Sequence, residues 1–151
     1  MDEKLNTMSD FIDTYRDIIV QIATPYSTGT GFFLKDRGLI VTNHHVIETG
    51  GADLSANIEV TLNNKQKYIA KIIGDDPSTD IALLKIDAKD LNYLSFGNSD
   101  ELETGDWVLA IGNPEKLRST VTAGIVSAKG RNINILEDRD FSIESFIQTD
   151  A

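Results

Sequence analysis

The sequence of 151 residues contains no cysteine, and it has only two histidines, three prolines and one tryptophan. Without cysteine the chain can form no disulfide bond, no thiolate zinc site and no cysteine nucleophile. No apolar run approaches the roughly 20 residues that span a bilayer. Basic residues are also scarce, 14 against 24 acidic ones, which gives a net charge of −10. Such a charge repels phosphate groups, so neither nucleic acid nor an anionic membrane is expected as a partner.

The beginning of the chain, "MDEKLNTMSD", is acidic and polar and does not have the pattern of a secretory signal peptide. We therefore expect either a cytoplasmic protein or a numbering that begins after a leader was removed. The hydrophobic fraction of 40% with 25% charged residues is typical of a soluble globular domain.

Hydrophobic periodicity predicts one helix followed by many strands. Leu5, Met8, Ile12, Tyr15 and Ile19 recur at spacings of three and four, which predicts a helix that ends near Arg16. Short alternating stretches follow, separated by Gly, Asn, Asp or Pro, and they predict a barrel or a sandwich. The predicted strands cover residues 18–22, 28–36, 38–43, 58–62, 68–72, 81–86, 106–112, 119–128, 132–136 and 145–149, with a boundary between two halves near 87–93.

The two histidines are adjacent, at positions 44 and 45 of "TNHHVIE". Neighbouring side chains diverge on a strand and on a helix, so such a pair rarely binds one ion. The acidic residues Asp75, Asp76 and Asp80 lack the alternation and central glycine of a calcium loop. We expect neither a metal nor a cofactor, and a metal hydrolase that uses both histidines is the weaker alternative.

His45 is also a candidate general base, because it follows the predicted strand 38–43. Asp80 opens the predicted strand 81–86, where its carboxylate could accept the Nδ1–H of an imidazole and fix its tautomer. An aspartate at a strand end often only terminates a turn, so these residues alone leave both interpretations open.

Several longer motifs in order, "STGTGFFL", "GLIVTNHHVI", "GDDPSTDIALLKI", "LSFGNSDELETGDWVLAIGNP", "STVTAGIVSA" and "FIQTDA", resemble the protease domain of the HtrA/Deg family. The resemblance runs from about Phe11 to the last residue. It implies a serine endopeptidase in which T-N-x-H-V supplies the catalytic histidine, here His45, and D-x-A-L-L-K the catalytic aspartate, here Asp80. His44 falls on a variable position of that motif and is expected to be a partly solvated neighbour.

The resemblance also implies that the nucleophile is not in this chain. Ser99 in "GNSD" falls in a loop before the second barrel and lacks the glycines of a nucleophile turn. Ser99 or Asp100 is instead expected to cap a turn or helix, and "STGTG" has no nucleophile-elbow context. Since "FIQTDA" stands immediately before the nucleophile turn in the family, the 151 residues alone are predicted to be inactive.

The predicted fold is all-β, a chymotrypsin-like double β-barrel with a short N-terminal helix. Residues 1–16 form the helical arm, 17–89 a complete first barrel and 90–151 a truncated second barrel. The uncovered strand edges of that second half predict poor solubility, a swapped partner or a complementary C-terminal segment.

The resemblance implies hydrolysis of unfolded polypeptides in protein quality control, by a homotrimer and outside the cytoplasm. The alternative is a non-catalytic, protease-like module that binds polypeptide.

Overall fold

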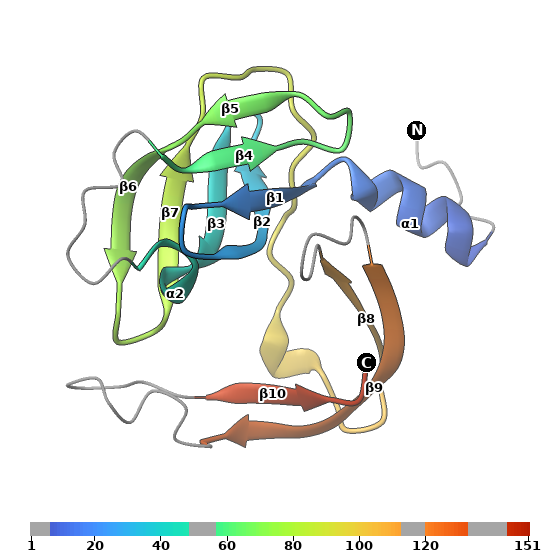
Figure 1. Ribbon diagram of the computed structural model, residues 1–151. Helices are drawn as coiled ribbons and strands as arrows, with labels where there is room; N and C mark the ends of the chain where they lie inside the picture. The colour runs from blue at the N-terminus through green and yellow to red at the C-terminus, as the bar shows by residue number, and fades with distance from the viewer. Residues whose placement is uncertain (1–6, 49–56, 113–119, 133–144) are drawn as a thin grey trace.

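The computed structural model describes residues 7–48, 57–112, 120–132 and 145–151. In this part of the chain a curled sheet and a smaller sheet are joined by an extended segment, and one helix lies at the N-terminal end (Figure 1). The elements are α1 (Met8–Arg16), β1 (Ile19–Ala23), β2 (Thr28–Lys35), β3 (Leu39–Asn43), α2 (His44–Ile47), β4 (Glu59–Thr61), β5 (Lys67–Ile69), β6 (Lys71–Asp76), β7 (Ile81–Lys85), η1 (Ser99–Glu101), β8 (Trp107–Gly112), β9 (Thr120–Arg131) and β10 (Phe146–Thr149).

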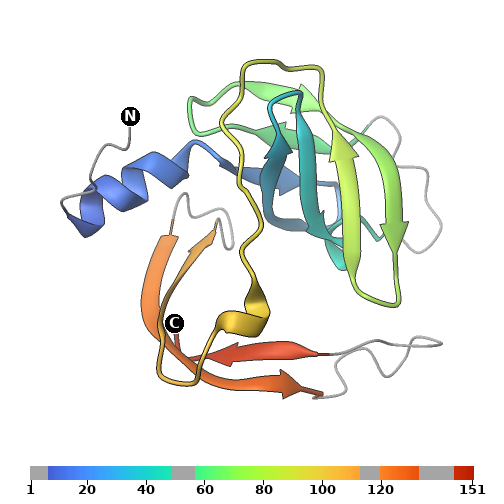
Figure 2. The ribbon, with the colours of Figure 1, turned by 180° about the vertical axis from the view of Figure 1, so that it is seen from behind.

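The larger sheet has seven strands in the order β5-β4-β1-β2-β3-β7-β6, and neighbouring strands are antiparallel. Its edge strands β5 and β6 are separated by Ala70 alone, so the sheet curls almost into a closed barrel (Figures 1 and 2). Alternating side chains of its strands form the core, a cluster of buried apolar residues that extends from Ile18 to Ile86. Phe33 is the largest side chain that is fully buried.

The smaller sheet has three antiparallel strands in the order β10-β9-β8. Val126 is its one fully buried side chain among the described residues, and Trp107 is 80% exposed. The segment that connects the two sheets is anchored to the larger one, because Leu94 donates its N–H to the carbonyl of Phe33 and packs with Leu91 against the core.

The mostly β architecture with a short N-terminal helix confirms the predicted fold class. Helix α1 ends at Arg16 as predicted and is capped by the Thr7 hydroxyl, which accepts the N–H of Asp10; Leu5 lies outside the described residues. No described helix is long and apolar enough to cross a membrane.

Two strand predictions need correction or lie outside the described part. Residues 68–72 do not form one strand, because the chain turns at Ala70, whose N–H donates to the carbonyl of Ile58, and β6 then continues along β7. Alternation in sequence does not record such a bend. The predicted strand 132–136 falls almost entirely in the part that is not described.

Candidate active site

Strand β3 leads directly into α2, a single helical turn that carries both histidines. Val46 and Ile47 on this turn are buried in the core, whereas the side chain of His45 is 58% exposed. Gly29 on β2 lies beneath Val46, and a Cβ at this position would overlap the valine methyl groups. The close contact between the strand and α2 fixes the direction in which His45 leaves the sheet.

Asp80 lies at the end of the turn between β6 and β7, immediately before β7 begins. Its backbone is in the left-handed region, with φ 57°, which costs a non-glycine residue about 1–2 kcal/mol. Asp76 organises the same turn by accepting hydrogen bonds from the Ser78 and Thr79 hydroxyls and from the Ser78 N–H. These bonds, led by that from the Ser78 side chain, lower the pKa of Asp76.

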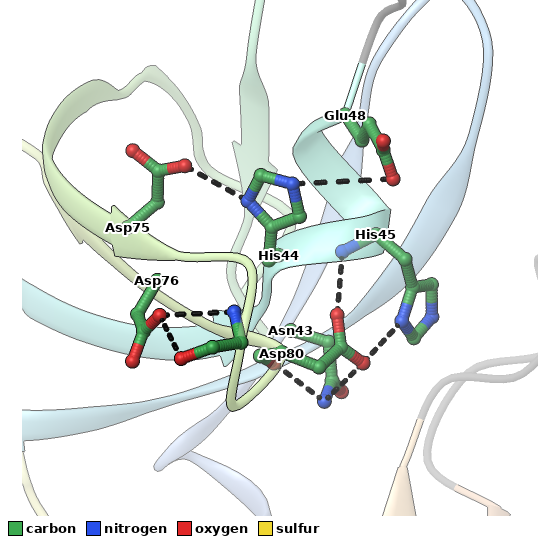
Figure 3. Close-up of polar contacts among 8 residues, drawn as sticks. Asn43, His44, His45, Glu48, Asp75, Asp76 and Asp80 are labelled. Atoms are coloured by element: carbon green, nitrogen blue, oxygen red, sulfur yellow. Dashed lines mark hydrogen bonds and ion pairs between the residues drawn. The ribbon is translucent and has the colours of Figure 1, made fainter. Parts of the chain in front are cut away.

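The structure brings the two predicted site residues together, although 35 positions separate them in the sequence. Nδ1 of His45 lies 2.7 Å from Oδ2 of Asp80, and the backbone N–H of His45 donates to Oδ1 at 2.9 Å (Figure 3). The side chain of Asp80 is only 14% exposed. A sheltered carboxylate therefore orients a solvent-accessible imidazole.

Asn43 completes the support of Asp80. Its side-chain Nδ2 donates to the Asp80 carbonyl oxygen at 3.1 Å and to Oδ2 at 3.3 Å. The backbone N–H of His44 donates to the same carbonyl at 3.0 Å. Three consecutive residues thus hold Asp80 in its unusual backbone conformation, and such conformations occur preferentially at functional sites.

The contact defines the tautomer of His45. A carboxylate can only accept, so the hydrogen bond to Asp80 requires a proton on Nδ1. In the neutral ring Nε2 then carries the lone pair, and among the described residues no side chain hydrogen-bonds to it. This arrangement can accept a proton at Nε2 and stabilise the resulting imidazolium through Asp80.

The two ring nitrogens of His44 lie near a different pair of carboxylates. Its Nδ1 lies 2.8 Å from Oδ2 of Asp75, at the distance of an ion pair but without the direction of a hydrogen bond, and its Nε2 lies 3.9 Å from Glu48 (Figure 3). The side chain of His44 is 12% exposed, which agrees with the expected partly solvated neighbour, and a carboxylate lies near each of its ring nitrogens. In the described part of the chain, no group of three or more His, Asp or Glu side chains is placed to hold a metal ion.

None of the described serines forms a hydrogen bond with the imidazole of His45. Ser99 begins the short helix η1, where its carbonyl accepts the N–H of Leu102. The expected capping role belongs to Asn98, whose side chain accepts the N–H of Asp100. Assigning the cap to Ser99 or Asp100 was therefore wrong by one or two positions.

The family profile described as "Trypsin-like peptidase domain" matches residues 29–151. The chain belongs to this family. Proteins named "Probable periplasmic serine endoprotease DegP-like" are similar to it, with 56% identity over 123 residues in Chlamydia muridarum (82% of this chain, 23% of the relative) and 43% over 155 residues in Rickettsia conorii (100% and 29%). The chain therefore spans about a quarter of the length of these relatives.

Solved structures of the family have the same fold. The HtrA-type protease AlgW with tripeptide superposes with a TM-score of 0.83 at 40% identity, over 96% of this chain and 46% of that one. The structure of Deg5 superposes with a TM-score of 0.79 at 33% identity, over 99% and 75%. These likenesses confirm the HtrA-type trypsin-like protease domain to which the sequence motifs pointed.

Sequence reasoning missed Asn43 and Asp75 as neighbours of the histidines. Asn43 could have been found, because it stands inside T-N-x-H-V next to both histidines. Asp75 carried no such signal, since only the pairing of three strands brings it to His44.

Proposed function

We propose that His45 is the general base, and Asp80 its orienting carboxylate, of a serine endopeptidase of the HtrA type. The observation that carries this proposal is the 2.7 Å contact between Nδ1 of His45 and Oδ2 of Asp80, with the carboxylate sheltered and the imidazole exposed. A module that only binds polypeptide would need no such contact.

In this mechanism Nε2 of His45 removes the proton from a serine hydroxyl as the oxygen attacks a peptide carbonyl. Asp80 stabilises the imidazolium, which then protonates the leaving amine and yields the new N-terminus and an acyl-enzyme. Water, deprotonated by His45 in turn, hydrolyses the ester and restores the serine. We propose that the serine and the oxyanion-hole amides lie in a part of the protein that corresponds to the portion of its relatives not covered by these residues.

The substrates, partners and location are part of the same proposal. By resemblance, the substrates are unfolded polypeptides, and the partner is a homotrimer or a complementary C-terminal segment. The proposed location is the periplasm, which the names of the relatives support. The division into an arm at 1–16 and barrels at 17–89 and 90–151 is supported by the two separate sheets, one formed by β1 to β7 and the other by β8 to β10.

The test is cleavage of a reduced, carboxymethylated protein by the full-length protein that contains this chain. We expect the wild type to cleave the unfolded substrate and not its native form, and His45→Ala to be inactive. Circular dichroism of the variant checks that it is folded. Binding of the unfolded substrate without cleavage by the wild type would instead establish the binding module.

A further inference from the structure

We propose that His44 is a positioning residue for His45 and Asp80, and that it acts through its polar contact with the carboxylate of Asp75. This inference rests on the proposed function. It starts from the contacts of His44, whose ring is 88% shielded and whose Nδ1 lies 2.8 Å from a carboxylate on a different strand (Figure 3).

The contact between His44 and Asp75 passes over strand β7, which begins at Ile81, next to Asp80. In the sheet, Asn43 of β3 lies opposite Ile81 of β7, and Asp75 of β6 lies opposite Ala82. His44 follows β3 directly, so its side chain reaches over the start of β7 to β6. The contact therefore links α2, which continues directly from β3, to β6 on the other side of β7, next to the turn that ends at Asp80.

Strand β6 needs such a link more than its neighbours do. It is an edge strand of the sheet, all six of its residues are exposed, and its register with β7 shifts between Ile72 and Gly74. Among the described residues β6 pairs with β7 alone, while the His44–Asp75 contact holds it to α2. Because β6 leads into the turn that ends at Asp80, movement of β6 moves the carboxylate that orients His45.

The side chain of residue 44 has a role separate from its backbone. The N–H of His44 donates to the Asp80 carbonyl whatever the side chain is, so substitution tests the imidazole alone. Glu48 lies farther away, at 3.9 Å from Nε2, and its side chain is 53% exposed. Asp75 is therefore the main partner of the His44 side chain.

The experiment compares kcat and KM of the full-length protein, of three single variants and of the double variant His44→Leu/Asp75→Asn on a fluorogenic peptide. His44→Leu keeps the approximate volume and removes the polar partner of Asp75, Asp75→Asn replaces the carboxylate by a neutral amide, and His44→Gln supplies a neutral N–H donor to the carboxylate. A small displacement of the Asp80 carboxylate, and with it of the His45 imidazole, should lower the rate by roughly 10- to 100-fold. We expect that loss in kcat, with KM unchanged, for His44→Leu and Asp75→Asn, no further loss in the double variant, and recovery of most activity in His44→Gln.

Asp13→Asn is the matched control, because it removes a carboxylate from an exposed ion pair with Arg16 on α1, and it should retain the wild-type kcat. Wild-type kcat in Asp75→Asn, or equal losses in His44→Leu and His44→Gln, would overturn the inference while leaving the proposed function intact. An inactive wild type would overturn both.

Discussion

Asp80 is the residue on which most of the site's geometry depends. It accepts the backbone N–H and the Nδ1–H of His45 with its two carboxylate oxygens, and its carbonyl accepts from His44 and Asn43. The left-handed backbone conformation allows these contacts to be made at the same time. One residue thus fixes both the position and the tautomer of the imidazole.

Asp80→Asn should lower kcat by about 10⁴-fold and leave KM nearly unchanged. An amide at this position cannot stabilise the imidazolium, and its NH₂ group favours the tautomer with the proton on Nε2. The measurement is steady-state cleavage of a fluorogenic peptide by the full-length protein. Retention of more than about a tenth of the wild-type kcat would rule out this role for Asp80.

At the scale of elements, the β6–β7 turn depends on Asp76. Its pKa is lowered in the folded state, so the folded protein binds fewer protons at this site than the unfolded chain. The associated stability is present above the usual carboxyl pKa of about 4 and is lost as the pH falls through the lower folded-state value.

Asp76→Asn should therefore unfold at a lower urea concentration than the wild type at pH 7. The difference between the two should shrink as the pH falls from about 4, where the unfolded chain takes up a proton, toward the lower pKa of the folded carboxylate. Urea midpoints at pH 7 and pH 3 measure this directly. A difference that is the same at both pH values would show that the charge of Asp76 does not stabilise the turn.

A close backbone contact and a hydrogen bond hold the end of β10 against β9. Asp150 accepts the N–H of Ile125 at 2.7 Å, and a Cβ on Gly124 would overlap Asp150 and the backbone of Ala151. The close approach requires glycine at this point.

Gly124→Ala should destabilise the protein by roughly 1–3 kcal/mol, because the extra methyl group must displace the segment at Asp150. Gly74→Ala is the matched control, since nothing lies within 4 Å of a Cβ at that position. Urea unfolding of the two variants provides the comparison. Equal midpoints for the two would contradict the close packing of β10 on β9.

At the scale of the whole molecule, the core belongs to the larger sheet. Phe33 is fully buried there, whereas Phe96, on the segment between the sheets, is 73% exposed. Phe33→Ala should cost roughly 3–5 kcal/mol of the free energy of unfolding, and Phe96→Ala within about 0.5 kcal/mol. Urea unfolding measures both, and similar costs for the two would contradict the placement of the core.

Part of this molecule could be predicted because the signals are local. The alternation of Ile18, Val20 and Ile22 predicted β1, and all three side chains are buried. The motifs around His45 and Asp80 predicted two residues that the structure places in contact.

The remainder depends on how distant segments meet. The single turn α2 is too short to show helical periodicity, and the bend at Ala70 depends on its hydrogen bond to Ile58 across the sheet. The contact of His44 with Asp75 joins residues that only the pairing of β3, β7 and β6 brings together. None of these leaves a pattern in the sequence.

The most direct test of the proposed base is the rate at which a fluorophosphonate labels the full-length protein. The reagent reacts with a serine only when a base activates it, so labelling reports on His45 without depending on the substrate. We predict stoichiometric labelling of the wild type at neutral pH and none of His45→Ala over the same period. Equal labelling of the two proteins, or no labelling of the wild type, would contradict the assignment of His45 as the general base of a serine protease.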